Sequence, residues 1–265
     1  MKRIIGMAMA FSLLLSSTSF ACSNQMEPVD RDDVTEFIER VKAAYSDGYA
    51  EGEMLLDDIR DAAVLCGLSS TTDERGSIFI AKLKDRDGYI VALGGTDITN
   101  REENIGIKED ILSAFNRDNK YKNNVICAIG EYIPSGSDLY VYGYSLGGMV
   151  MQQVLADKAI RNNYCVVAAV AIGSPVVNIN RQEIVFVEDT SDVVPYLSAG
   201  TVLMRKIFYG KDTHIVRDGG FKTTIGAHAL SYVDSPVWAD IDLLGEVCGS
   251  ETILIDMTES ISLPG

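Results

Sequence analysis

The feature that most constrains this sequence is a glycine-rich turn around Ser145. Residues 143–148 read Gly-Tyr-Ser-Leu-Gly-Gly and contain Gly-x-Ser-x-Gly, a pattern that joins a strand to a helix through a sharp turn. The apolar run 139–142 predicts the strand, and 149–156 predicts the helix. Glycines permit the strained backbone and the close approach that this turn needs. The alternative interpretation is a plain glycine-rich turn in a flavodoxin-like sheet.

The segments around this turn predict an α/β protein. Four further strands are expected, at residues 77–81, 89–93, 165–172 and 183–187. The first two flank a turn at 85–88 and are expected to form a hairpin. The third is apolar without alternation, which is typical of a strand buried on both faces of a parallel sheet. With helices expected at 108–115 and 121–133, the order predicts a mostly parallel central sheet flanked by helices.

Residues 1–21 are typical of a secretory signal peptide. A basic start and an apolar run at 4–15 are followed by small and polar residues that end at Ala21. The run is too short for a stable membrane span. Cleavage after Ala21 predicts a secreted or periplasmic protein, with a lipoprotein anchor at Cys22 as the less favoured alternative.

The remaining chain is expected to contain one catalytic domain. Residues 22–70 predict an N-terminal helical segment, with one amphipathic helix near 34–45 and a second one that includes Leu55. Residues 71–265 show no repeat and no linker, so they are assigned to a single domain.

Charge and cysteine usage exclude several functions. The formal net charge is −15, and loss of the leader removes two more cations, so we expect no nucleic-acid partner and no docking to anionic membranes. The five cysteines show no CxxC and no metal-ligand spacing, so no metal and no cofactor is predicted. The pairing of the five, including Cys22, stays open. Four of them are expected to be core or paired residues: Cys66, Cys127, Cys165 and Cys248.

A nucleophilic serine needs a base, and the base needs an orienting carboxylate. The chain has only two histidines, His214 and His228. Asp192 follows the expected strand 183–187, at the carboxyl edge where α/β sheets assemble their sites. The order Ser145, Asp192, His228 is the order that α/β-hydrolases use. Asp189 is the alternative acid, and His214 is the alternative base.

Four stretches of the chain resemble the class 3 lipases. Residues 91–96 are similar to the family's oxyanion strand and turn, and 143–148 match its nucleophile turn. Residues 191–195 resemble its Asn-Asp-x-Val-Pro segment, and 227–232 its late Asp-His-x-x-Tyr segment. Gly94 departs from the family, which usually has arginine there.

The resemblance implies an α/β-hydrolase fold and a role for each matched residue. Ser145 would be the nucleophile, His228 the base and Asp192 the acid of a catalytic triad. The backbone N–H groups of Thr96 and Leu146 would form the oxyanion hole. His214 resembles a non-catalytic histidine of the family.

The resemblance also implies an activity, the hydrolysis of carboxylic esters of lipids by a secreted serine hydrolase. The alternatives are a phospholipase, acyltransferase or peptidase with the same triad, or a catalytically silent lipase-like binding protein. Residues 97–110 are too poor in large apolar residues for a broad lid. We therefore expect a preference for dispersed, short-to-medium acyl esters and weak interfacial activation. Residues 202–209 are candidates for an acyl pocket or for ordinary core.

Overall fold

The computed structural model describes the chain in segments. These are residues 49–50, 53–56, 78–84, 86–95, 120–177, 184–197, 214–220, 227–228, 231–232, 237, 245–246, 249–250 and 253–263. Several sequence predictions fall outside the described residues. They concern the signal peptide, Cys22, Cys66, Cys248, Thr96, the lid stretch 97–110, the expected helix 108–115 and residues 202–209.

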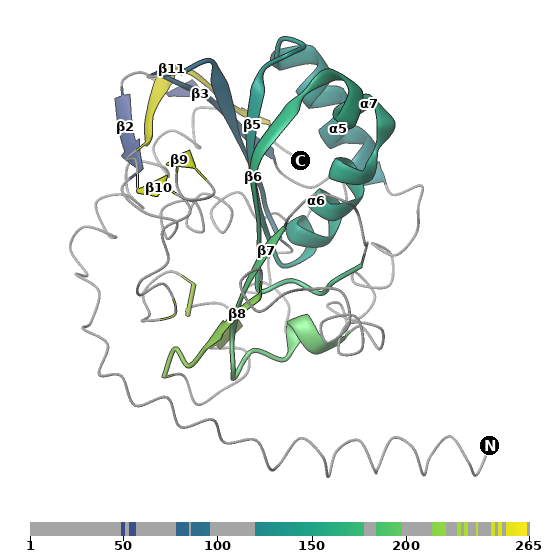
Figure 1. Ribbon diagram of the computed structural model, residues 1–265, viewed down its shortest axis with the longest axis vertical. Helices are drawn as coiled ribbons and strands as arrows, with labels where there is room; N and C mark the ends of the chain where they lie inside the picture. Colours follow the sequence, from purple (N-terminus) through teal and green to yellow (C-terminus); the bar gives the residue numbers. More distant parts are fainter. Residues whose placement is uncertain are drawn as a thin grey trace.

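A nine-stranded sheet forms the centre of the described structure (Figure 1). Its strands are β1 (Tyr49–Ala50), β2 (Glu53–Leu56), β3 (Ile78–Leu83), β4 (Gly88–Leu93), β5 (Asp138–Tyr144), β6 (Cys165–Ile172), β7 (Val185–Asp189), β8 (His214–Arg217) and β11 (Ile253–Leu263). The order is β1-β11-β3-β4-β5-β6-β7-β8, with β2 also paired to β11. Neighbours from β4 to β8 are parallel, whereas β3 and β4 form an antiparallel hairpin. Two short strands, β9 (Gly245–Glu246) and β10 (Gly249–Ser250), pair separately.

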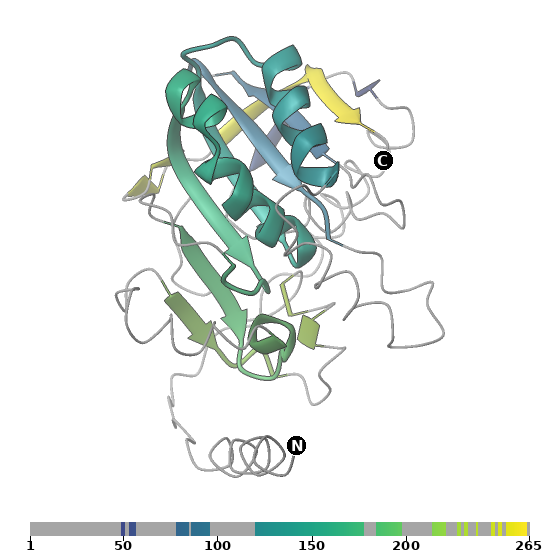
Figure 2. The same ribbon diagram turned by 90° about the vertical axis from the view of Figure 1, so that its right-hand side faces the viewer.

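In both ribbon views, three α-helices cover one face of this sheet (Figures 1 and 2). They are α5 (Lys120–Tyr132), α6 (Leu146–Ala156) and α7 (Lys158–Asn163). A 3-10 turn, η1 (Val194–Leu197), follows β7. Asp157 separates α6 from α7, because its carboxylate accepts the N–H of Ala159 and caps the second helix. None of the described helices is long and apolar enough to cross a membrane.

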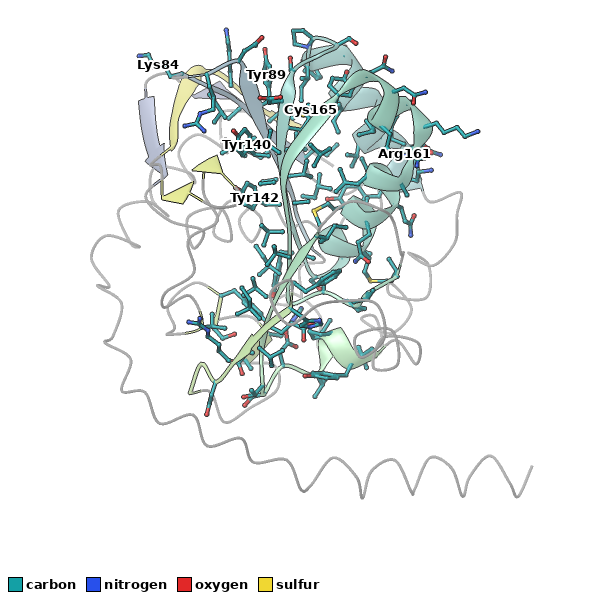
Figure 3. The ribbon with its side chains drawn as sticks, in the orientation of Figure 1. Lys84, Tyr89, Tyr140, Tyr142, Arg161 and Cys165 are labelled. Atoms are coloured by element: carbon teal, nitrogen blue, oxygen red, sulfur yellow. The ribbon has the colours of Figure 1, made fainter. Side chains whose placement is uncertain are left out.

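The period of two along each strand determines which residues face the helices. Leu139 and Val141 of β5 belong to the core cluster that packs β3 to β7 against α5 and α6. Tyr140 and Tyr142 project from β5 on the side away from the helices (Figure 3). Both are buried as well, so β5 is covered on its two faces. This is the burial expected for the inner strands of a parallel sheet.

The architecture is of the α/β class that the sequence predicts, with a mixed, mostly parallel sheet flanked by helices. The hairpin of β3 and β4 is confirmed, and β6 spans the predicted residues 165–172. One prediction is wrong, because Leu55 lies in β2 and not in a helix. Four residues of the segment predicted as helical thus pair with the C-terminal strand β11 in the main sheet.

Candidate active site

Ser145 lies at the turn between β5 and α6. Its N–H donates a 2.9 Å hydrogen bond to the carbonyl of Ile172, at the end of β6. Its own carbonyl accepts the N–H groups of Gly148 and Met149, in the first turn of α6. The serine is therefore tied to the neighbouring strand on one side and to the helix on the other, and it is only 8% exposed.

The backbone at Ser145 is strained. Its φ of 53° and ψ of −118° lie where side chains are rarely tolerated, and such a conformation costs about 1–3 kcal/mol. In the part of the chain that the structure describes, Ser145 is the sole non-glycine residue with positive φ. Gly147 permits the turn, because a Cβ there would lie 2.1 Å from the carbonyl oxygen of Leu93. The glycine-rich segment thus forms the predicted sharp strand-to-helix turn.

Asp192, His228 and Ser145 form one chain of contacts. Asp192 is fully buried beyond the end of β7, and its Oδ2 lies 2.8 Å from Nδ1 of His228. Because a carboxylate only accepts hydrogen bonds, Nδ1 carries the imidazole proton and donates it. Nε2 is then the acceptor, and it lies 3.0 Å from Oγ of Ser145. The structure thus brings together the three residues that the sequence singles out.

A backbone hydrogen bond links the two short segments that contain His228 and Tyr232. Residues 227–228 are helical, and the N–H of Ser231 donates to the carbonyl of Ala227 in the manner of an α-helix. The side chains of His228 and Tyr232 both reach Asp192. The Tyr232 hydroxyl donates to Oδ2 of Asp192 at 2.8 Å. No role is predicted for Tyr232 from the sequence, although its spacing from His228 is a signal that could have found it.

Tyr232 is held in place from two further directions. Its hydroxyl accepts the N–H of Asp189 at 3.0 Å. A Cβ on Gly173 would lie 2.8 Å from the Tyr232 ring and 3.0 Å from Oδ2 of Asp192, and φ at Gly173 is +54°. The pocket around the acid therefore requires glycine at this position. Burial and then the charge of Asp192 raise the pKa of Tyr232 well above its usual range, so the phenol stays a donor.

The alternative acid, Asp189, is engaged elsewhere. Its Oδ1 accepts the N–H of Ser191 at 2.7 Å, and its Oδ2 accepts the N–H of Gly219 at 3.0 Å. Burial raises the pKa of the Asp189 carboxyl, and these backbone hydrogen bonds partly offset the effect. Asp189 thus organises the loops that follow β7 and β8, whereas Asp192 contacts the imidazole.

The alternative base, His214, begins β8 and pairs with a different carboxylate. Its Nε2 lies 3.1 Å from Oε1 of the buried Glu188, and its ring stacks on Phe186 with centroids 5.6 Å apart. The N–O distance is that of an ion pair, although the angle is not that of a hydrogen bond. The imidazole that contacts Ser145 is therefore that of His228.

Tyr144, the last residue of β5, also contacts the imidazole. Its ring stacks on that of His228, with centroids 5.0 Å apart and planes 25° apart. Its hydroxyl donates to the main-chain carbonyl of His228 at 2.5 Å. Burial and then the charge of Asp192 raise the pKa of Tyr144 well above its usual range. No pattern in the sequence singled out this residue.

Of the two predicted oxyanion donors, Leu146 lies within the described residues. Leu146 is the first residue of α6, where N–H groups have no acceptor within the helix and the helix dipole is positive. Thr96 lies outside the described residues, but the preceding turn is described. A Cβ on Gly95 would lie 2.9 Å from the Cβ of Ser145, and the carbonyl of Gly94 accepts the hydroxyl of Tyr121. The turn after β4 is therefore held beside the serine.

Metal-binding groups and cysteines are the other reactive side chains to consider among the described residues. Within these segments, no group of three or more His, Cys, Asp or Glu residues is arranged to hold a metal ion. Cys127 and Cys165 are free and exposed, so the expectation that they are core or paired residues is wrong.

Comparisons with known proteins give a likeness among solved structures. No protein-family model matches the chain, and no curated protein sequence matches it. Among solved structures, the chain is similar to the crystal structure of the Lip2 lipase from Yarrowia lipolytica. The identity is 15% and the TM-score 0.39, over 82% of this chain and 99% of that one.

Proposed function

We propose that this protein is a serine hydrolase that cleaves carboxylic esters of lipids through an acyl-enzyme. One observation carries the proposal: Nε2 of His228 lies 3.0 Å from Oγ of Ser145, while its Nδ1 lies 2.8 Å from Oδ2 of Asp192. A base within hydrogen-bond reach of the hydroxyl, and a carboxylate that orients the base, are what a serine needs to become nucleophilic.

The reaction would proceed in two halves. Ser145 Oγ attacks the ester carbonyl carbon while its proton passes to Nε2 of His228. The carbon–oxygen bond to the alcohol then breaks, and His228 returns that proton to the leaving oxygen. A water molecule next attacks the acyl-enzyme, gives a proton to His228 and releases the acid, and Ser145 regains its proton. Asp192 stays ionised throughout, holding the imidazole tautomer and stabilising the imidazolium.

Negative charge develops on the carbonyl oxygen in both halves. The N–H of Leu146, at the positive end of α6, is available to stabilise it. The N–H of Thr96 is the proposed second donor, and the position of Gly95 against Ser145 supports this. Loss of one such donor typically costs about 2.7–4 kcal/mol of barrier height.

Exposed apolar side chains beside the triad favour an ester with an apolar part. Val193, Tyr196 and Leu197 directly follow Asp192 and are 46%, 38% and 47% exposed. Val194, between them, packs with Met149 and Leu146 at the start of α6. We infer that an apolar surface lies near the start of α6, which favours lipid esters over peptides as the substrate class.

A panel of esters of graded acyl length, with a matched peptide amide, tests this proposal. We expect the wild-type protein to hydrolyse the esters, to prefer short-to-medium acyl chains and to leave the amide uncleaved, while Ser145→Ala is inactive. Faster cleavage of the amide would assign the triad to a peptidase. Ester hydrolysis that survives in Ser145→Ala would overturn the proposal.

The same panel tests the expectation of weak interfacial activation. The rate is measured against substrate concentration through the solubility limit. We expect a smooth curve, because the stretch 97–110 contains few large apolar residues. A sharp jump when an emulsion forms would contradict this expectation and indicate an enzyme that works at lipid surfaces.

A further inference from the structure

Tyr144 is adjacent to the nucleophile in sequence, yet its side chain contacts the base. Its ring lies parallel to the His228 imidazole within 25°, and its hydroxyl reaches the carbonyl of the same histidine. These two contacts restrain different parts of the histidine, its ring and its main chain.

We propose that Tyr144 is a positioning residue, which holds the His228 imidazole in line with Ser145 by stacking on the ring and by binding the main-chain carbonyl. This inference rests on the proposed function, because a base is positioned only if the serine is a nucleophile. It assigns a role to the variable residue that precedes the serine in Gly-x-Ser-x-Gly.

Tyr144 is rigid enough to serve as such a support. It ends β5, a strand with parallel neighbours on both sides, and it pairs with Ile172 of β6. Its side chain lies edge-on to Tyr232, with ring centroids 6.1 Å apart. The His228 turn is therefore attached to the central strand through Tyr144 and to the loop after β7 through Asp192. An error of about 1 Å in the position of a reacting group can cost about a hundredfold in rate.

The stacked ring also suits the charge that His228 acquires during the reaction. An aromatic face attracts a cation placed over it, so the ring of Tyr144 stabilises the imidazolium. The phenol itself remains neutral, because burial and Asp192 raise the pKa of Tyr144 well above its usual range. The other groups that face His228 are the Asp192 carboxylate, the Tyr232 phenol beyond it and the Ser145 hydroxyl.

Two variants separate the contributions of the ring and the hydroxyl. Tyr144→Phe keeps the ring and removes the hydrogen bond, whereas Tyr144→Leu removes both. Tyr140→Phe is the matched control, because it removes a hydroxyl from the same strand, where Tyr140 accepts from Arg86 and not from the site. Figure 3 labels Tyr140 on β5, on the same side of the strand as Tyr142. Each variant is measured for kcat, KM, the pH dependence of kcat/KM, the rate of fluorophosphonate labelling and Tm.

Tyr144→Phe should lower kcat and the labelling rate about tenfold, with KM changed by less than about twofold, because it loses only the hydrogen bond to the His228 carbonyl. Tyr144→Leu should lower both rates about a hundredfold. It should also move the acid limb of kcat/KM to lower pH, because the imidazolium loses its aromatic neighbour. Tyr140→Phe should keep wild-type kinetics.

The inference is overturned if Tyr144→Phe and Tyr144→Leu keep wild-type labelling rates and an unchanged acid limb. It is also overturned if Tyr144→Phe raises KM without lowering kcat, since that would place Tyr144 in substrate binding. Failure of the proposed function looks different, because wild type and Tyr140→Phe would then be as unreactive as the Tyr144 variants. Tyr144→Phe preserves the aromatic ring, so the test holds even if Tyr144→Leu fails to fold.

Discussion

Tyr232 and His228 donate hydrogen bonds to the same oxygen of Asp192. Both donor–acceptor distances are 2.8 Å, and the second carboxylate oxygen accepts the N–H of Val194. Both carboxylate oxygens of the acid of the proposed triad therefore accept hydrogen bonds from protein groups, although Asp192 is fully buried. Three donors around a buried carboxylate hold it in a fixed orientation.

Removal of the Tyr232 hydroxyl tests this arrangement. Tyr232→Phe should lower kcat by about threefold to tenfold, because a hydrogen bond to a charged group is lost. It should also destabilise the protein by about 1–3 kcal/mol, because the buried N–H of Asp189 loses its acceptor. Steady-state kinetics and denaturant unfolding measure the two effects. An unchanged unfolding free energy would contradict the second.

The two histidines should behave in opposite ways. His228→Ala and Ser145→Ala should each remove nearly all esterase activity, and the double variant should be scarcely worse, because such residues act as a unit. His214→Ala should keep most activity but lower Tm, because it removes the imidazole that contacts the buried Glu188 carboxylate and stacks on Phe186. An inactive His214→Ala together with an active His228→Ala would show that the base is wrongly assigned.

The buried carboxyl of Asp189 should make the thermal stability of the protein depend on pH. Burial raises the pKa of this carboxyl above its ordinary value of 3.8, so the folded state binds the proton more readily than the unfolded state. Ionised Asp189 therefore costs stability at neutral pH, and the cost is relieved as pH falls through the folded-state pKa. The Tm of wild type relative to Asp189→Asn should rise from about pH 7 to about pH 4. A relative Tm that falls over this range would contradict the sign.

The strained backbone at Ser145 gives a test that is independent of activity. Both Ser145→Gly and Ser145→Ala lose the nucleophile, but only glycine adopts a φ of 53° with a ψ of −118° without strain. We expect Ser145→Gly to be the more stable of the two by about 1 kcal/mol. Thermal unfolding of the pair measures this, and equal Tm values would argue against strain at the turn.

Sequence patterns predicted those elements of the fold that depend on neighbouring residues. The unbroken apolar run of β6 indicated its bounds and its burial, and the glycines around Ser145 indicated the turn. β11 was missed, because Ile253–Leu263 contains several polar residues and its partners β2 and β3 lie far away in sequence. Leu55 was placed in a helix, because a short apolar stretch fits either period when its pairing is unknown.

The candidate site was predictable to a similar extent. The order and the flanking residues of Ser145, Asp192 and His228 pointed to the three side chains that the structure brings together. The supporting tyrosines were not predicted, because their roles depend on where a ring and a hydroxyl end in space. Tyr144 reaches over the imidazole from β5, and Tyr232 reaches the acid from the turn of His228.

The most direct test of the central claim is covalent labelling of the native protein with a fluorophosphonate, followed by mass spectrometry of its peptides. We expect a single label on Ser145 that is absent in Ser145→Ala, strongly slowed in His228→Ala and undiminished in His214→Ala. The reason is that the reagent reports activation of the serine by its base, whatever the natural ester is. No label on folded wild-type protein, under conditions where a control serine hydrolase reacts, would contradict it.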